Sequence, residues 1–306
     1  MMDMGDQVLV KLRNKAQKSG MPFQLHLQLF CQEEFLRRLS LSKYVNNLVL
    51  KGGLFIYTLT NFESRATIDI DFLLRNLPAN PAEMQEIVEE ILAINTGNNY
   101  ISFLTRGYEE ISIQRKYRGI SFQVIGHIKN TRTPFNVDLG VEDIIIPKAD
   151  MRKIPVQLDN YEKPMVATYS LESTIAEKFD AILQRLQLTS RMKDFYDIFY
   201  LSHAFDYDGR QLQQAIFETL QNRGTYYDAN SLDKIVSFSS DEEMQVQWRR
   251  FLDRSHLPML SFDYVLHKID SFLNPVWKAI VSENELFETW YADKSIWEAS
   301  NSRQKL

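Results

Sequence analysis

The feature that most constrains this chain is a pair of carboxylates inside an apolar segment. Residues 66–74, ATIDIDFLL, have the composition of a buried β-strand, yet they contain Asp69 and Asp71. Residues two apart on a strand point to the same face. Both carboxylates therefore project together, while Ile68, Ile70 and Phe72 pack on the other side. Because moving an ion out of water is costly without a partner, the strand either turns its aspartates to solvent or holds something cationic.

A pair of glycines precedes this strand. Lys51, Gly52 and Gly53 stand before LFIYTL, a run long enough for a short helix. Backbone N–H groups of glycines at a helix N-terminus can bind an anion such as a phosphate. A tight turn that requires a positive φ explains the glycines equally well when they are considered alone.

The paired aspartates favour a divalent cation, because two adjacent carboxylates otherwise repel each other. Oxygen ligands of this kind suit Mg²⁺, which keeps several waters and shares phosphate oxygens of a substrate. A third carboxylate, Asp138, lies in FNVDLGV, which also reads as a strand. We expect Asp138 to complete a site for two metal ions. The alternative for Asp138 is a strand-end residue that pairs with Arg or Lys.

The order of periodic segments predicts an α+β fold, a mixed sheet flanked by helices and followed by a mainly α-helical domain. Residues 7–45 have helical spacing, interrupted near Gly20, and a helix is expected to begin at Pro81. Alternating segments between 100 and 146 predict several strands. The proline-rich stretch 144–165 lacks periodicity, so we place a boundary there, between domains 1–160 and 161–306. After about residue 168 nearly everything reads as helix.

The first helix of the second half, LESTIAEKFDAILQRL, has a lysine on its apolar stripe. Lys178 falls among Leu171, Ile175 and Ile182, whereas Glu177, Asp180 and Gln184 fall on the opposite, solvated side. A lysine in this position either extends its ammonium group to water or points across the domain junction at a phosphate. We favour the phosphate.

The next helix, in SRMKDFYDIFYL, has Ser190 as its expected N-cap. Arg191 and Asp194 lie one turn apart, at the buried face, and are expected to pair. Lys193 and Asp197 are expected on the exposed side, as in an ordinary salt-bridged helix.

Composition excludes several classes of protein. The 306 residues have a net charge of −5 and one cysteine, Cys31, so an internal disulfide is excluded and a general nucleic-acid coating role is disfavoured. Basic residues gather at Lys11, Arg13, Lys15 and Lys18 and at Arg115, Lys116 and Arg118; each group is either a local RNA contact or a solvated face. No apolar run approaches the ~20 residues of a membrane span, and no secretory signal begins the chain, so we expect a cytoplasmic protein.

Four motifs together resemble one known family. These are LKGG, the R-x-T-x-D-x-D of Arg65, Thr67, Asp69 and Asp71, the A-E-K that ends at Lys178, and the R-x-K-D-x-x-D that begins at Arg191. The chain resembles the AbiEii/AbiGii-type nucleotidyltransferases, toxins of abortive-infection and toxin–antitoxin systems that are distant relatives of the DNA-polymerase-β nucleotidyltransferases. Many nucleotidyltransferases have Gly-Ser where this chain has Gly52 and Gly53.

The resemblance implies a nucleotidyltransferase-like fold and Mg²⁺-dependent transfer of a nucleotide from an NTP to an acceptor, tRNA in particular, with a cognate antitoxin as partner. Asp69, Asp71 and Asp138 would hold two Mg²⁺ ions, and Asp194 would be needed for activity. The nucleotide and its phosphates would be bound by Lys51, Gly52, Gly53, Arg65, Thr67, Lys178 and Arg191. Rival hypotheses are a metal-dependent nuclease or kinase, although no GxxxxGK[ST] is present, and a catalytically silent RNA- or partner-binding protein.

Overall fold

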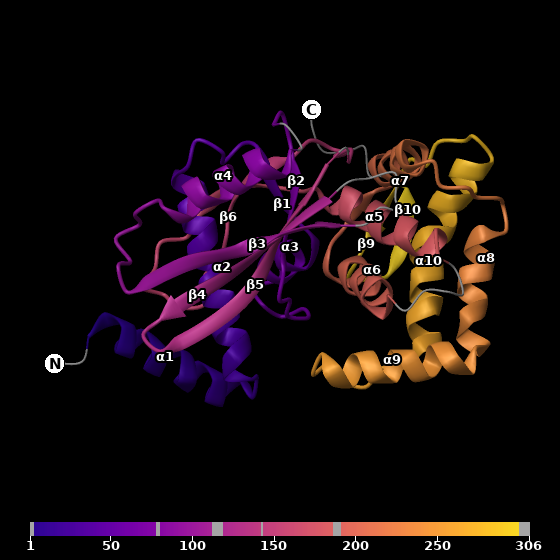
Figure 1. The fold of residues 1–306 in the computed structure, drawn as a ribbon. Helices are drawn as coiled ribbons and strands as arrows, with labels where there is room; N and C mark the ends of the chain where they lie inside the picture. The colour runs from indigo at the N-terminus through magenta and orange to yellow at the C-terminus, as the bar shows by residue number, and fades with distance from the viewer. Residues whose placement is uncertain (1–2, 78–79, 112–118, 142, 186–190, 300–306) are drawn as a thin grey trace, which may run out of the picture. The chain divides into compact units, whose positions relative to one another are not determined.

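The computed structural model describes residues 3–77, 80–111, 119–141, 143–185 and 191–299 (Figure 1). The chain divides into two compact units. The first comprises residues 1–143 and 149–169, and the second comprises 144–148 and 170–306. In the described part of the chain, no helix combines the length and the apolar character needed to cross a bilayer.

The first unit is built on a seven-stranded mixed sheet with the order β3-β4-β5-β2-β1-β7-β6. Its strands are β1 Leu48–Lys51, β2 Ile70–Leu74, β3 Ile101–Ile111, β4 Gly119–Ile128, β5 Thr131–Gly140, β6 Asp150–Lys153 and β7 Met165–Thr168. The pairs β2–β5 and β1–β7 are parallel, and the other pairs are antiparallel. The predicted α+β class with a mixed sheet is confirmed.

Four helices accompany this sheet: α1 Met4–Ser19, α2 Phe23–Leu41, α3 Gly52–Leu59 and α4 Pro81–Leu92. The predicted break in the first helical region is confirmed, because Gly20 ends α1 in the left-handed conformation with φ 71°. Asn80 caps the helix that was expected to begin at Pro81. Cys31 of α2 is fully buried, and a Cβ added at Gly126 of β4 would lie 2.5 Å from its Sγ. Helix α2 therefore packs closely on one face of β4.

The two faces of β4 and β5 differ in the way that a sheet covered on one side requires. Phe122, Val124, Phe135 and Val137 are buried on one face. On the other face the alternate residues Ser121, Gln123, Asn136 and Asp138 all retain some exposure. This partly open polar face is where the predicted carboxylates lie.

Two details of this unit differ from the sequence-based expectation. Ile68 is 50% exposed rather than packed, because β2 begins only at Ile70 and Asp69 immediately precedes the strand. The stretch 144–165, expected to lack regular structure, contains β6 and the start of β7. Strands of four residues are too short to show a period of two. Residues 161–169 consequently belong to the first unit, beyond the boundary predicted at 160.

The second unit is mainly helical, as predicted. Its helices are α5 Leu171–Leu183, α6 Met192–Ala204, α7 Gly209–Arg223, α8 Ser231–Val236, α9 Glu242–Arg254 and α10 Phe262–Val281. A small antiparallel sheet of β8 Tyr207–Asp208, β9 Glu288–Tyr291 and β10 Ile296–Ala299 was not predicted. Its strands are short, and they are stabilised by aromatic packing of Trp290 and Trp297 on Phe272.

Candidate active site

A row of polar side chains crosses four strands of the first unit at one level. Lys51 of β1 is the register partner of Asp71 of β2, and Asp71 is the partner of Asp138 of β5. Asp138 is in turn opposite Ser121 of β4. Neighbouring strands are about 4.8 Å apart, so the sheet brings Asp71 and Asp138 side by side although they are distant in the sequence.

Neighbouring strands also orient the carboxylates. The Ser121 hydroxyl donates a hydrogen bond of 2.6 Å to Asp138 Oδ1, and the Asn136 amide donates one of 3.1 Å to Asp69 Oδ1. Asp69, Asp71 and Asp138 are all half-buried. Asp71 and Asp138 thus lie side by side on one face of β2 and β5, Asp69 lies just before β2, and all three carboxylates keep some exposure.

The glycine pair is fitted against this row. Gly52 has φ +67°, and a Cβ added there would lie 2.1 Å from Asp71 Oδ2. A Cβ added at Gly53 would lie 2.8 Å from Thr67 Oγ1. Gly52 and Gly53 form the first turn of α3, where backbone N–H groups have no intrahelical acceptor. The positive φ that a tight turn requires is therefore observed at Gly52, and phosphate binding by the glycine pair stays a prediction.

Lys51 contacts groups of the protein itself. Its Nζ lies 2.6 Å from Asp143 Oδ2, with both side chains largely buried, and it stands over the ring of Tyr169 at 5.5 Å. Asp143 was not identified from the sequence. The only signal was the acidic pair in GVED after the strand of Asp138.

Gln32 of α2 is a second contributor that the sequence did not reveal. It is fully buried, and its Nε2 donates 2.7 Å to the carbonyl oxygen of Ile68, next to Asp69. Arg65, predicted to bind phosphate, is 8% exposed. Helix α2 is buried on nearly all sides and rich in polar residues, so hydrophobic periodicity could not show that Gln32 contacts the backbone that leads into β2.

A second cluster of charges lies in the second unit. Lys178 of α5 is buried, and its Nζ lies 3.0 Å from Asp194 Oδ1 and 2.7 Å from Asp197 Oδ2 of α6. Arg191 Nε lies 2.5 Å from Asp194 Oδ2, which confirms the predicted pair. Arg191, rather than the predicted Ser190, occupies the N-cap position of α6; Ser190 lies outside the described residues.

Two side chains expected on solvated helix faces are buried. Asp197 is 1% exposed and Asp180 is 0% exposed. Helix α6 packs against α5, α9 and α10, and α5 packs against α6 and α7, so each helix buries more than one stripe. Asp180 instead accepts 2.9 Å from Arg223 of α7.

The cations of this cluster control the charge of Asp194. Burial by itself would raise the pKa of the Asp194 carboxyl, but Lys178 and Arg191 more than compensate and hold this pKa below its usual value. Asp194 is thus an ionised carboxylate between two cations.

The structure therefore forms two groups from the predicted site residues. Asp69, Asp71, Asp138, Gly52, Gly53 and Thr67 assemble in the first unit, and Lys178, Arg191 and Asp194 assemble in the second. Within the described residues, no three His, Cys, Asp or Glu side chains converge as a ready-made metal site. The all-oxygen donor set still fits Mg²⁺, which commonly uses one or two carboxylates together with water and substrate phosphates. The basic cluster Arg115, Lys116 and Arg118 lies outside the described residues.

Comparison with known proteins agrees with the motifs. The model of the nucleotidyl transferase AbiEii toxin family, type IV toxin–antitoxin system, matches residues 34–268. The fold is similar to the nucleotidyltransferase toxin MenT4 from Mycobacterium tuberculosis, with a TM-score of 0.52 and 14% identity over 86% of this chain and 94% of that one. It is also similar to a putative nucleotidyltransferase from H. pylori, with a TM-score of 0.50 and 11% identity over 87% of this chain and 100% of that one. No curated protein matches. Because the family model covers most of the chain, the protein belongs to the AbiEii family of nucleotidyl transferase toxins of type IV toxin–antitoxin systems.

Proposed function

We propose that the protein transfers a nucleotide from an NTP to the acceptor end of tRNA in a Mg²⁺-dependent reaction that a cognate antitoxin opposes. The observation that carries the proposal is the placement of Asp71 beside Asp138 and against the main chain of Gly52. This arrangement places a carboxylate pair beside the first turn of α3, whose backbone N–H groups have no intrahelical acceptor, and a metal–triphosphate complex can use both.

Each residue of the first unit has a defined task in this proposal. Asp69, Asp71 and Asp138 would hold the metal, while Ser121 and Asn136 fix the rotamers of Asp138 and Asp69. Gly52 and Gly53 would let the triphosphate approach the N–H groups of the first turn of α3. Bound Mg²⁺ would supply charge neutralisation at the reacting phosphate and lower the pKa of the attacking hydroxyl.

The cations of the second unit are the proposed ligands of the leaving pyrophosphate. Lys178 and Arg191 each contact Asp194, so phosphate contact would require each of them to share its charge between a carboxylate and a phosphate. Such groups stabilise the charge that develops on the leaving group.

The direct test is label transfer. Purified protein is incubated with each α-labelled NTP, Mg²⁺ and total tRNA, and Asp71→Asn and Asp138→Asn are compared with the exposed control Asp159→Asn. We expect label on tRNA from one preferred NTP, a loss of about 100-fold or more in both site variants, and wild-type activity in the control.

Three outcomes would overturn the proposal. One is the absence of label transfer at any NTP. Another is shortening of tRNA without NTP consumption, which would reveal a nuclease. The last is undiminished growth arrest by Asp71→Asn together with RNA or partner binding that needs no Mg²⁺ in vitro, which would reveal a catalytically silent binding protein.

A further inference from the structure

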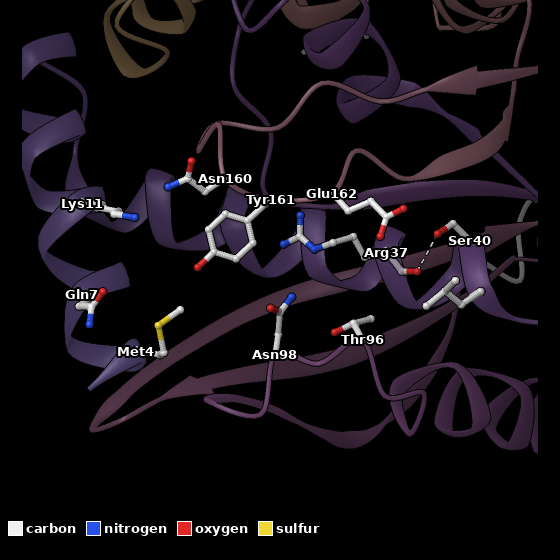
Figure 2. Close-up of a pocket in the computed structure, with 11 residues that line it drawn as sticks. Met4, Gln7, Lys11, Arg37, Ser40, Thr96, Asn98, Asn160, Tyr161 and Glu162 are labelled. Carbon is white, nitrogen blue, oxygen red and sulfur yellow. Dashed lines mark hydrogen bonds between the residues drawn. The ribbon is translucent and has the colours of Figure 1, made fainter. Parts of the chain in front are cut away.

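A cavity of about 360 Å³ lies in the first unit, apart from the carboxylate row (Figure 2). Its walls come from α1, α2, the turn after α4 and the loop before β7. Among the described residues that line it, none belongs to β1, β2, β4 or β5, the strands that form the row. Its volume is within the range of small-ligand sites, roughly 300–1,000 Å³.

A buried guanidinium group reaches this cavity. Arg37 of α2 is 4% exposed, and Figure 2 shows its guanidinium extending between Tyr161 and Asn98. Its Nε donates 2.8 Å to Glu34 Oε2, but Nη1 and Nη2 meet no acceptor within the described chain. The ring of Tyr161 lies 5.2 Å from the guanidinium carbon. Leaving a buried charged donor without an acceptor is costly, so these nitrogens are suited to an acceptor that enters from the cavity.

The carboxylate behind Arg37 is already saturated. Glu34 is fully buried and accepts from Arg37 and Arg38 Nε, from the Thr96 hydroxyl at 2.5 Å and from the Asn98 amide at 2.7 Å. Burial also raises the pKa of neighbouring Glu33 to about 8, which leaves this carboxyl mostly neutral at pH 7. One carboxylate therefore faces two guanidinium groups, and the surplus charge beside the cavity is positive.

The rim adds one charge of each sign. Lys11 of α1 and Glu162 are both exposed lining residues. Lys11 would attract an anion to the cavity and Glu162 would repel one, so the rim leaves the net positive charge beside Arg37 unchanged.

We propose that this cavity binds a small ligand through a phosphate or carboxylate group held by Nη1 and Nη2 of Arg37. A planar guanidinium presents parallel N–H groups that match two oxygens of an oxyanion. The Asn98 and Asn160 side chains on the cavity wall supply polar partners for the rest of the ligand. The site is separate from the proposed nucleotide site and does not depend on nucleotidyl transfer.

The test measures anion binding to the full chain by calorimetry and by the shift in melting temperature, with phosphate, pyrophosphate and citrate as probes. Protein and buffers are first freed of divalent metal on a chelating resin, so that metal-assisted binding at the carboxylate row does not contribute and no soluble chelator competes as an anion. We expect millimolar or tighter binding of at least one probe. Arg37→Gln should weaken it about 10-fold or more, because a hydrogen-bonded charge is lost, and Lys11→Glu should weaken it several-fold.

The exposed lysine Lys18, on the same helix but outside the cavity, provides the matched control. Lys18→Glu makes the same change in charge as Lys11→Glu and should bind as wild type does.

Binding of phosphate without citrate identifies a phosphorylated ligand, and the reverse identifies a carboxylate. The proposal is overturned if no probe binds, or if Lys18→Glu weakens binding as much as Lys11→Glu. Should Arg37→Gln fail to fold, Lys11→Glu alone decides. Asn160→Ala removes a polar residue of the cavity wall and should leave label transfer to tRNA unchanged, so the two proposals can fail separately.

Discussion

At the residue scale, Gly52 is the position in the candidate site that leaves the least room for a side chain. Gly52→Ala would place a Cβ 2.1 Å from Asp71 Oδ2 and would also occupy a positive φ. The conformation alone costs roughly 1–2 kcal/mol, and the overlap forces Asp71 to move. We expect loss of label transfer together with a fall in the free energy of unfolding, measured by urea titration.

Gly20→Ala separates these two effects. Gly20 has φ +71°, and nothing lies within 4 Å of an added Cβ. This variant should therefore lose only the conformational energy and keep its activity. Equal activity of the Gly52 and Gly20 variants would show that close contact between Asp71 and the main chain is unnecessary.

Glu33 predicts a pH dependence of stability. Burial raises its pKa from 4.5 to about 8, and only its Oε1 has a hydrogen-bond donor, the backbone N–H of Gln157. The folded state keeps this proton to higher pH than the unfolded state. The contribution of Glu33 to the free energy of unfolding is therefore most favourable below about pH 4.5, and it declines as the pH rises from there to about 8.

Glu33→Gln mimics the protonated acid and should remove this dependence. We expect the variant to melt near the wild-type temperature at pH 5 and above it at pH 8. At pH 8 the gain in the free energy of unfolding should be a few kcal/mol, since each unit of pKa shift is worth about 1.4 kcal/mol. The exposed control Glu86→Gln should show no such crossover. If Glu33→Gln shifts the melting temperature equally at pH 5 and pH 8, Glu33 has the same charge in the folded and the unfolded state.

The residues of the first unit also show what sequence can reveal about a site. The sequence pointed to Asp69, Asp71 and Asp138 because a carboxylate in an apolar strand is anomalous, and the structure places Asp71 beside Asp138. It did not point to Gln32 or Asp143, because a polar residue in a helix or after a strand is ordinary. The positions of Gln32 and Asp143 become visible only in the structure, from the hydrogen bond of Gln32 to the Ile68 carbonyl and the ion pair of Asp143 with Lys51. The register of β2 with β5 likewise shows that Asp71 and Asp138 are neighbours.

At the scale of elements, the Lys178 cluster joins α5 to α6. Lys178→Met would deprive two buried carboxylates, those of Asp194 and Asp197, of their shared cation. Breaking a buried pair in this way costs about 3–5 kcal/mol. We expect a large fall in the free energy of unfolding, and the exposed control Lys278→Met on α10 should change it by less than about 0.5 kcal/mol.

Activity decides whether this lysine also serves catalysis. If Lys178→Met folds at low temperature and still transfers label at the wild-type rate, the lysine only joins the two helices. If it folds with near wild-type stability and is inactive, the phosphate role predominates. The periodicity of α5 and α6 placed Asp180 and Asp197 in solvent, because a hydrophobic stripe identifies one buried face and these helices have several.

At the scale of the whole molecule, the sequence correctly separated a mixed α/β unit from a mainly helical one but placed the boundary too early. The reason is β7, whose Val166 and Thr168 are fully buried. Thr168 is the register partner of Leu50 in β1, and the Tyr169 N–H donates 2.9 Å to the Leu50 carbonyl oxygen. Four residues following a proline-rich stretch gave no periodic signal for this contact.

Truncation tests the observed boundary. A fragment ending at residue 160 lacks β7, so β1 would have an unpaired edge and Lys51 would lose the ring of Tyr169 beside it. A fragment ending at residue 169 keeps both. We expect the longer fragment to show a cooperative thermal transition by circular dichroism, and the shorter one to aggregate through its exposed edge. Val166→Asp in the longer fragment should reproduce the defect, because it places a charge in the buried strand without shortening the chain. If the shorter fragment melts as cooperatively as the longer one, β7 is dispensable and the first unit ends where the sequence alone had placed its boundary.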